Sequence, residues 1–279
     1  MLLVISDPIS PAIHLGPLSV RWYGVSYAIA FLVGSWLAVR HLAGRGVPRQ
    51  VAERVTFWTI IAGLLGARLY FVAQNQPNWY LTHPQHLLAA WEGGMAFFGA
   101  VFAALVALMF WSWRLRLDFW DLLDAGVLFA AVGQPIGRIG NIMNGEILGP
   151  ASSLPWAIRY TNPESMAPHL GVAYQPANAY EGLATLCILA VLLMLRRRGL
   201  ASGLLGLTYL VLYPLSQLVV FYWRTDAETP VVLLGLKQAQ LTALFVLIVV
   251  VPVFVLAWWR AHRPSSRASA ATAMGGTSR

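Results

Sequence analysis

Long apolar stretches constrain this chain more than any other feature, because about 20 mostly apolar residues are enough to cross a lipid bilayer as a helix. A bilayer offers no water to unpaired backbone groups, and a helix satisfies these groups within the segment itself. The sequence therefore predicts an all-α integral membrane protein with a seven-helix domain over residues 20–262. The expected spans are Val20–Val39, Val55–Val72, Gly94–Trp113, Phe119–Ile136, Ala179–Leu195, Leu204–Trp223 and Gln238–Trp259.

The composition supports this interpretation and excludes several others. Of the 279 residues, 58% are hydrophobic and 11% are charged, whereas an average soluble protein carries about 25% charged residues. The single cysteine, Cys187, lies in an apolar run, so neither a disulfide framework nor a cysteine metal site is expected. The first ten residues, MLLVISDPIS, have no basic segment ahead of the apolar one, so we expect no cleavable signal peptide.

The basic residues indicate an orientation in the membrane. Thirteen of the nineteen lysines and arginines follow the first, third, fifth and seventh spans. They are Arg40, Arg45, Arg49, Arg54, Arg114, Arg116, Arg196, Arg197, Arg198, Arg260, Arg263, Arg267 and Arg279. The positive-inside rule places this side in the cytoplasm, with the N-terminus outside and the C-terminus inside. Because the net charge of +8 is concentrated at the ends of spans, no nucleic-acid partner is expected.

The segments between the spans complete the expected organisation. Residues 1–19 are expected to form an outer N-terminal segment, with outer loops at 73–92, 137–178 and 225–237. Residues 263–279 are rich in serine, alanine and glycine, and this composition predicts a disordered cytoplasmic tail.

Polar groups gather in one short motif after the fourth span, GRIGNIMNGEILG over Gly137–Gly149. A charged side chain at a helix centre in a bilayer costs roughly 2.5–3.5 kcal/mol on insertion scales unless it has partners. The cluster therefore indicates a site, and the alternative is a polar exit from the helix at the membrane surface. Gln134, Pro135 and the glycines are expected to break or thin the helix end, since irregular backbone at this depth must be buried in protein or line a wet cavity.

The residue types in this motif suit recognition of a phosphate. Arg138 is planar and always charged, which favours bidentate phosphate binding. Asn141 and Asn144 are three residues apart and share a face on a helical turn, where their amides can bind phosphate or hydroxyl groups. Glu146 either holds Arg138 in place or acts as a base.

Two further arginines belong to the same expected face. Arg68 lies within the second span and requires an acidic partner, with Asp124 the first candidate and Glu146 the next. Arg224 ends the sixth span, where it either extends to lipid headgroups or joins Arg68 and Arg138 in a three-cation site for an anionic headgroup.

Several other polar residues have ordinary structural explanations. Tyr23 fits an interfacial aromatic belt, and Asn75 fits a cap at the end of the second span. Tyr180 and Glu181 open the fifth span, where the helix dipole favours an acidic residue.

The motif resembles the signature of prolipoprotein diacylglyceryl transferases, which runs G-R-x-(G/A)-N-F-apolar-N-x-E-x-x-G. The chain matches it in register from Gly137 to Gly149, with Ile142 where phenylalanine is usual. The resemblance covers about residues 14–260 and implies the same seven-span topology. Further matches are RWYGVSY at Arg21–Tyr27, GARLYFVAQN at Gly66–Asn75, WEGGMAF at Trp91–Phe97, YE at Tyr180–Glu181 and FYWRTDAE at Phe221–Glu228.

The resemblance implies an enzyme of the bacterial inner membrane whose active face points outward. The thiolate of the lipobox cysteine in a preprolipoprotein signal peptide attacks the glyceryl carbon of phosphatidylglycerol, a thioether forms and glycerol phosphate leaves. No cofactor or metal is implied, and surrounding membrane lipids are the remaining partners. The implied catalytic residues are Arg138, Asn141 and Glu146, and the implied substrate-binding residues are Arg138, Asn144, Gly149, Tyr23, Arg68, Asn75, Tyr213 and Arg224.

Some positions depart from the family pattern. Phe98, Gln217 and Phe221 stand where a histidine, an arginine and a glutamate are usual, and Gln175 and Asn178 replace a histidine and a glutamine. Either Arg224 or Arg68 is then expected to supply the lost cation, and either Glu146 or hydroxide the lost base. These changes favour an alternative, a non-catalytic phospholipid-binding protein on the same scaffold, whereas the intact motif favours the enzyme. A transporter is disfavoured because paired half-helices are missing from the sequence pattern.

Overall fold

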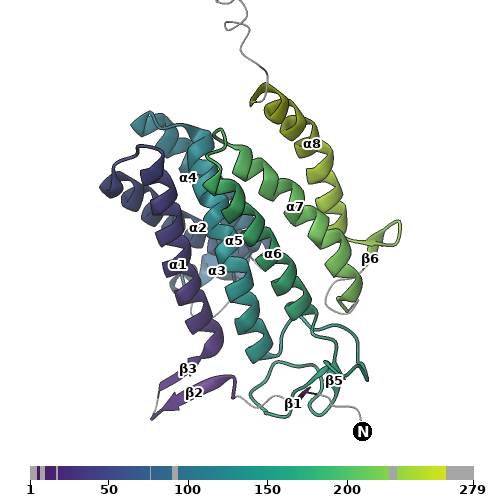
Figure 1. Ribbon diagram of the computed structural model, residues 1–279. Coiled ribbons are helices and arrows are strands. Elements are labelled where there is room, and N and C mark those ends of the chain that lie inside the picture. Colours follow the sequence, from purple (N-terminus) through teal and green to yellow (C-terminus); the bar gives the residue numbers. More distant parts are fainter. Residues whose placement is uncertain are drawn as a thin grey trace, which may run out of the picture.

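The computed structural model describes residues 5–6, 10–16, 18–75, 77–89, 94–225 and 231–261. The tail expected at 263–279 lies outside the described residues, as does part of the expected segment 1–19. The chain is mostly helical, and short strands connect some of the helices (Figure 1).

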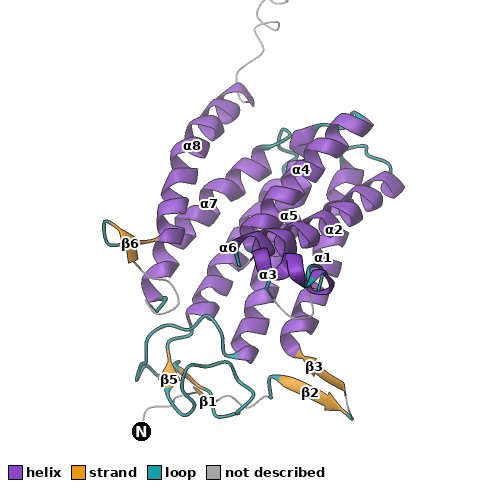
Figure 2. Ribbon diagram, turned by 180° about the vertical axis from the view of Figure 1, so that it is seen from behind, coloured by secondary structure: helices purple, strands orange, loops and turns teal. Residues whose placement is uncertain are grey.

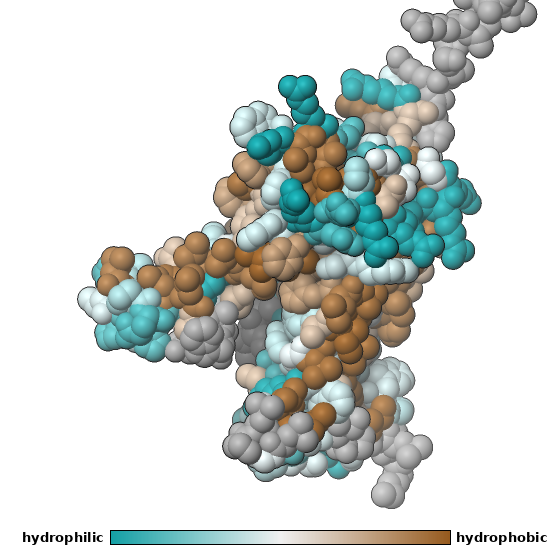
Figure 3. All heavy atoms as spheres, turned by 90° about the vertical axis from the view of Figure 1, so that its left-hand side faces the viewer, coloured by the Kyte–Doolittle hydropathy of each residue, from teal (hydrophilic) through white to brown (hydrophobic). Residues whose placement is uncertain are grey.

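Seven helices in the described part of the chain are long and apolar enough to cross a membrane, which confirms the expected number of spans. A space-filling view shows hydrophobic residues across the middle of the molecule and hydrophilic residues gathered toward one end (Figure 3). The spanning helices are α1 (Trp22–Gly44), α2 (Arg49–Gln74), α4 (Phe97–Leu115), α5 (Phe119–Asn144), α6 (Ala177–Arg197), α7 (Leu204–Val220), which continues as the 3-10 turn η3 (Phe221–Trp223), and α8 (Gln238–Ala261).

Helix α5 lies at the centre of the bundle, in contact with α1, α4, α6 and α7 (Figure 1). Buried apolar residues of α5 pack against apolar residues of the neighbouring helices and form the core. Leu128 and Ala131 are fully buried against Leu37 of α1, Leu192 of α6 and Leu205 of α7. Burial of a leucine side chain contributes about 1.5–3 kcal/mol, so this cluster fixes the positions of α1, α6 and α7 around α5.

The fourth span is longer than the sequence predicts. We expected Pro135 and the following glycines to end it near Ile136, but α5 continues to Asn144, with Pro135 inside the helix. The loop expected at 137–178 therefore begins at Gly145. Proline is tolerated within membrane helices because neighbouring helices and local adjustments satisfy the freed backbone groups.

The two ends of the bundle differ in structure. The basic end is defined here as the end at which α1 finishes and α2, α5 and α7 begin, and the site end as the opposite one, where α5 finishes. Short strands lie at the site end and beside the start of α8 (Figures 1 and 2). They are β1 (Ile5–Ser6), β4 (Ile158–Arg159) and β5 (Ala173–Tyr174) in one sheet, the hairpin β2 (Ala12–Leu15) and β3 (Leu18–Arg21), and the hairpin β6 (Val231–Leu233) and β7 (Leu236–Lys237).

The segment between α2 and α4 is partly helical. It contains α3 (Pro77–Thr82) and the 3-10 turn η1 (Pro84–His86), and the view from behind shows α3 on that side of the bundle (Figure 2). The expected loop 73–92 thus holds a short helix, and α2 itself extends to Gln74.

A buried carboxylate ties three helices together at the basic end. Asp124 of α5 is fully buried and accepts hydrogen bonds from the backbone N–H groups of Gly203, at 2.9 Å, and Gly206, at 2.7 Å. These groups open α7 and have no partner within that helix. Arg45, just after α1, lies 3.2 Å from Asp121 and 4.0 Å from Asp124. Asp124 therefore acts as the cap of α7, and its expected pairing with Arg68 is wrong.

Replacing Asp124 with alanine is expected to lower the free energy of unfolding by about 3 kcal/mol, because buried N–H groups lose their acceptor and Arg45 loses a counter-charge. Asp118 provides a matched control, since it caps α5 from an exposed position. Asp118→Ala is expected to cost about 1 kcal/mol. Thermal unfolding of both variants in detergent tests this ranking, and equal losses would contradict the role of Asp124.

Candidate functional site

The polar motif occupies the last turns of α5 and the start of the loop that follows. Because residues 137–144 are helical, Arg138 and Asn141 are neighbours one turn apart. The Arg138 guanidinium donates a hydrogen bond to the Asn141 side-chain oxygen at 3.1 Å. The Asn141 amide in turn donates to the Glu146 carboxylate at 3.0 Å. The spacing read from the sequence thus gives a continuous line from Arg138 through Asn141 to Glu146.

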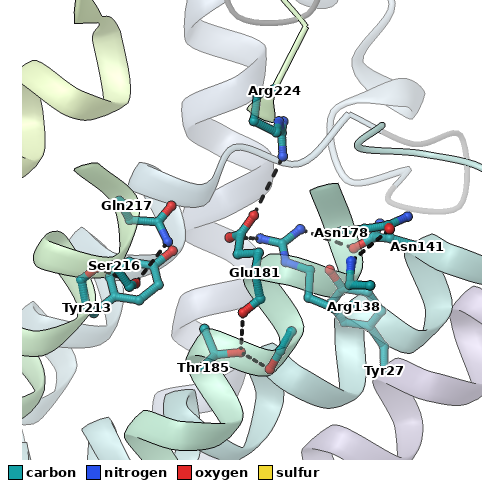
Figure 4. A network of polar contacts seen from close by, with 12 residues as sticks. Tyr27, Arg138, Asn141, Asn178, Glu181, Thr185, Tyr213, Ser216, Gln217 and Arg224 are labelled. Carbon is teal, nitrogen blue, oxygen red and sulfur yellow. Dashed lines mark hydrogen bonds and ion pairs between the residues drawn. The ribbon is translucent and has the colours of Figure 1, made fainter. Parts of the chain in front are cut away.

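Two arginines meet at one buried carboxylate, which belongs to Glu181 in the first turns of α6 (Figure 4). Arg138 donates to one Glu181 oxygen at 2.5 Å, and Arg224 lies 3.7 Å from the other. The side chain of Glu181 is 2% exposed, and those of Arg138 and Arg224 are 20% and 12% exposed. This trio carries one net positive charge in a largely desolvated place, which favours binding of an anion.

The partner of Arg138 therefore differs from the one considered in the sequence analysis. Glu146 was one candidate to hold Arg138, but Glu181, interpreted there as a helix-dipole residue, makes the direct contact. Glu146 reaches Arg138 only through Asn141. The side chain of Asn178, which is fully buried, donates to the Glu146 backbone carbonyl at 2.9 Å and fixes the backbone that carries this carboxylate.

Arg224 is positioned by groups at the end of α7. Its guanidinium lies 5.3 Å from the centre of the Phe221 ring, a cation–π distance. The buried Gln217 amide donates to the side chain of the adjacent Ser216 at 3.4 Å (Figure 4). The Tyr213 ring stacks on Tyr209 at 5.5 Å. Two of the residues that depart from the family pattern, Gln217 and Phe221, thus lie beside the arginine pair.

Asn144 belongs to a second contact, made with the N-terminal hairpin. Its side-chain oxygen accepts a hydrogen bond from Arg21 at 2.8 Å, and its amide lies 3.1 Å from the Met166 sulfur. Nearby, His14 of the same hairpin contacts Glu164 at 3.0 Å, and this hydrogen bond holds the pKa of the Glu164 carboxyl below its usual value. Asn144 therefore anchors the segment after α5 to the hairpin, whereas Asn141 faces Arg138.

Two glycines allow the loop after α5 to fold back onto the bundle. Gly145 has a φ of 78° at the end of the helix, a conformation that suits glycine. At Gly149 a side chain would lie 2.6 Å from the Trp223 carbonyl oxygen. The absence of a side chain at Gly149 thus lets the loop touch the segment that carries Arg224, and this contact brings the two arginines close.

An apolar groove leads along the bundle to Arg138. It lies between α1, α5 and α6 and has a volume of about 570 Å³. Val33 and Trp36 of α1, Ile139 of α5, and Leu183 and Leu186 of α6 line it with other apolar residues, and Arg138 is the only ionisable residue among its described lining. Trp36, Ile139, Leu183 and Leu186 are each at least half exposed, so the groove opens toward the side of the bundle.

Arg68 lies in a different environment from the one predicted. Its guanidinium donates to the backbone carbonyls of His86 at 2.6 Å, Leu87 at 3.0 Å and Gly94 at 3.1 Å. It also lies over the Tyr80 ring at 5.5 Å. These contacts hold the α2–α4 connection, so Arg68 organises that segment, whereas Arg138 and Arg224 share the Glu181 carboxylate.

The remaining predicted residues lie near the end of α5 or at a helix end. The Tyr23 hydroxyl donates to that of Tyr27 at 3.3 Å, and the Tyr23 backbone packs against Gly140. The side chain of Asn75 donates to the Phe71 carbonyl at 2.9 Å, which is the helix cap that its position suggested.

Sequence reasoning missed the roles of Glu181 and Arg21 in this region. The only local signal for Glu181 was its place beside Tyr180 at the start of a span, and Arg21 appeared only as a basic residue ahead of the first span. Both contacts join segments that are far apart in the chain, so spacing gives no indication of them.

Comparison with known proteins agrees with the motif. A family model described as prolipoprotein diacylglyceryl transferase matches residues 10–258. The chain is similar to the phosphatidylglycerol–prolipoprotein diacylglyceryl transferase of Rhodospirillum centenum, with 34% identity over 96% of each chain. The enzymes of that name from Methylobacillus flagellatus and Thermosynechococcus vestitus are 33% and 32% identical, over 84% and 83% of this chain and 90% and 86% of their own.

Replacing Gly149 with alanine is expected to lower the free energy of unfolding by about 1–3 kcal/mol, because the added methyl group overlaps the Trp223 carbonyl. Gly133→Ala in α5 is the control, since nothing lies within 4 Å of a side chain there and alanine favours a helix. Thermal unfolding of the two variants measures the difference. Equal stability of Gly149→Ala and the parent protein would exclude the close contact.

Proposed function

This chain belongs to the prolipoprotein diacylglyceryl transferase family, and we propose that the polar network around Arg138 carries out its reaction. The protein is a multi-pass membrane transferase that moves the diacylglyceryl group of phosphatidylglycerol onto prolipoproteins. One observation supports the proposed site above all others, namely two arginines on a single buried carboxylate at the polar end of an apolar groove.

The lipid donor fits this arrangement in one orientation, with its acyl chains in the groove and its phosphate at the arginines. Its acyl chains lie in the groove between α1, α5 and α6, where apolar side chains replace neighbouring lipid. Its phosphate then reaches Arg138 at the end of the groove, and Arg224 approaches the same anion from α7. Arginine binds phosphate through parallel N–H groups, which fixes orientation as well as charge. The groove's lateral opening gives a lipid access to Arg138 from within the bilayer.

The reaction requires charge stabilisation at the phosphate. The thiolate of the acceptor, which we assign to the lipobox cysteine, attacks the glyceryl carbon attached to the phosphate oxygen. A sulfur–carbon bond forms as the carbon–oxygen bond breaks, and its electron pair leaves on the phosphate of glycerol phosphate. Arg138 and Arg224 stabilise this developing charge, because fixed cations in a water-poor site act strongly on a transition state.

A base must take the thiol proton, and Glu146 is the residue that we assign to this role. Its carboxylate is half-buried, is oriented by Asn141 and lies next to the proposed phosphate site. Phe98, at the position of the usual histidine, is 50% exposed at the start of α4 and offers no proton acceptor. The cation missing at Gln217 is supplied by Arg224, which Phe221 and Glu181 hold in place.

We place the site end of the bundle outside the bacterial inner membrane. The arginine-rich helix ends at the opposite face support this orientation through the positive-inside rule. Four further residues that the resemblance implies, Asn144, Gly149, Tyr23 and Tyr213, shape the site around the lipid headgroup.

Arg138→Ala is expected to lower transfer at least a hundredfold, because the phosphate loses its principal donor. The assay mixes purified protein, phosphatidylglycerol and a lipobox peptide and follows the peptide mass. The transfer rate of Arg138→Lys should fall between those of the parent and Arg138→Ala, since lysine keeps the charge but loses the paired donors. Arg114→Ala, at an exposed position on the basic end, is the control and should match the parent. Absence of any diacylglyceryl adduct with folded parent protein would refute the proposed function.

Glu146→Gln is expected to reduce the rate chiefly near neutral pH and to recover part of it at alkaline pH. The reason lies in the acceptor, because a free thiol with a pKa of about 8.5 ionises without help once the pH exceeds that value. Rates of the parent and the variant from pH 6.5 to 9.5 give the comparison. A constant ratio of the two rates across this range would exclude Glu146 as the base.

A further inference from the structure

The first turn of α8 buries polar side chains that the proposed reaction does not use. Lys237, immediately before the helix, is 6% exposed and Gln240 is 3% exposed, although most of α8 is exposed apolar surface. Lysine and glutamine are seldom buried this deeply without specific partners. Gln238, between them in sequence, is exposed. Among the polar side chains at the start of α8, burial is therefore confined to Lys237 and Gln240, which face α7, the helix with which α8 makes most of its contacts.

Both residues bind backbone carbonyls where α7 ends. The Lys237 ammonium donates to the Arg224 carbonyl, and the Gln240 amide donates to the Leu218 carbonyl at 3.0 Å. The Lys237 backbone N–H donates to the Gln240 side-chain oxygen at 3.0 Å, which links the pair. The last carbonyls of a helix have no partner within the helix, so the start of α8 supplies donors to the end of α7.

These contacts connect α8 to the phosphate site through one residue. Arg224 presents its carbonyl to Lys237 and its guanidinium to Glu181, which binds Arg138. The carboxyl end of a helix carries a partial negative charge of about half an electron. Such a charge beside the site opposes an anionic phosphate, and a lysine at this end offsets it. The position of Lys237 thus affects both where Arg224 lies and how well the site accepts an anion.

We propose that Lys237 and Gln240 are positioning residues that place Arg224 against the phosphate of the lipid donor. This inference rests on the proposed function, because it concerns the same phosphate. It assigns α8 a specific role in lipid binding, and the acceptor peptide does not depend on these contacts.

The test measures KM for phosphatidylglycerol and for the lipobox peptide separately in the full-length protein. Lys237→Met and Gln240→Leu are expected to raise KM for the lipid about tenfold, the effect of losing one charge-assisted or buried hydrogen bond. KM for the peptide should stay within about twofold, which is little more than 0.4 kcal/mol. Gln238→Leu is the matched control on the exposed side and should leave both values unchanged.

A double-mutant cycle shows whether Lys237 acts through Arg224. In an Arg224→Ala background, Lys237→Met is expected to change KM for the lipid less than twofold, because the group that it positions is gone and only its effect on the charge at the end of α7 remains. Lys237→Gln keeps a donor without the charge and should lie between lysine and methionine. If Lys237→Met does not fold, Lys237→Gln and Gln240→Leu provide the same comparison.

Three results would overturn the positioning role: an unchanged lipid KM in folded Lys237→Met and Gln240→Leu, an equal rise in both KM values, or a full tenfold effect in the Arg224→Ala background. Loss of transfer in the parent and in Gln238→Leu would instead refute the proposed function itself.

Discussion

The buried carboxylate of Glu181 is the interaction on which the site depends. A carboxylate and two guanidiniums taken out of water each lose several kcal/mol of solvation, and they remain charged there because each has a fixed partner. Arg138 comes from α5, Glu181 from α6 and Arg224 from the end of α7. The trio therefore forms only when these three segments are correctly packed, and removing Glu181 takes away the counter-charge that the two arginines share.

Helix α5 connects the packed core of the bundle to this trio. At the basic end Asp124 fixes the start of α7, and at the site end Arg138 and Asn141 contact each other beside the proposed phosphate position. Because α5 continues through Pro135 without a break, both groups lie on one rigid element. If the helix ended at Pro135, Arg138 would lie in a loop, and its contact with Glu181 would cost more conformational entropy.

Two of the departures from the family pattern, Gln217 and Phe221, lie near Arg224 at the end of α7. Phe221 provides an aromatic face for Arg224, and Glu181 provides its counter-charge, so the arginine has a defined position with a neutral Gln217 nearby. The start of α8 holds the backbone of that arginine from the other side. The cationic character of the site is thus spread over three helices and over residues that the motif does not contain.

The sequence alone determined the number of spans and the motif, because length, hydropathy and residue order are local properties. It predicted one shared face for Asn141 and Asn144, but Asn141 contacts Arg138 and Asn144 contacts Arg21. It did not determine that α5 continues past Pro135, which depends on surrounding helices that satisfy the backbone. Nor did it identify the backbone carbonyls that Arg68 binds, or the partner of Arg138, which is a glutamate 43 residues away. Pairing across such distances follows from how helices pack, and only the tertiary structure decides which charges share one buried position.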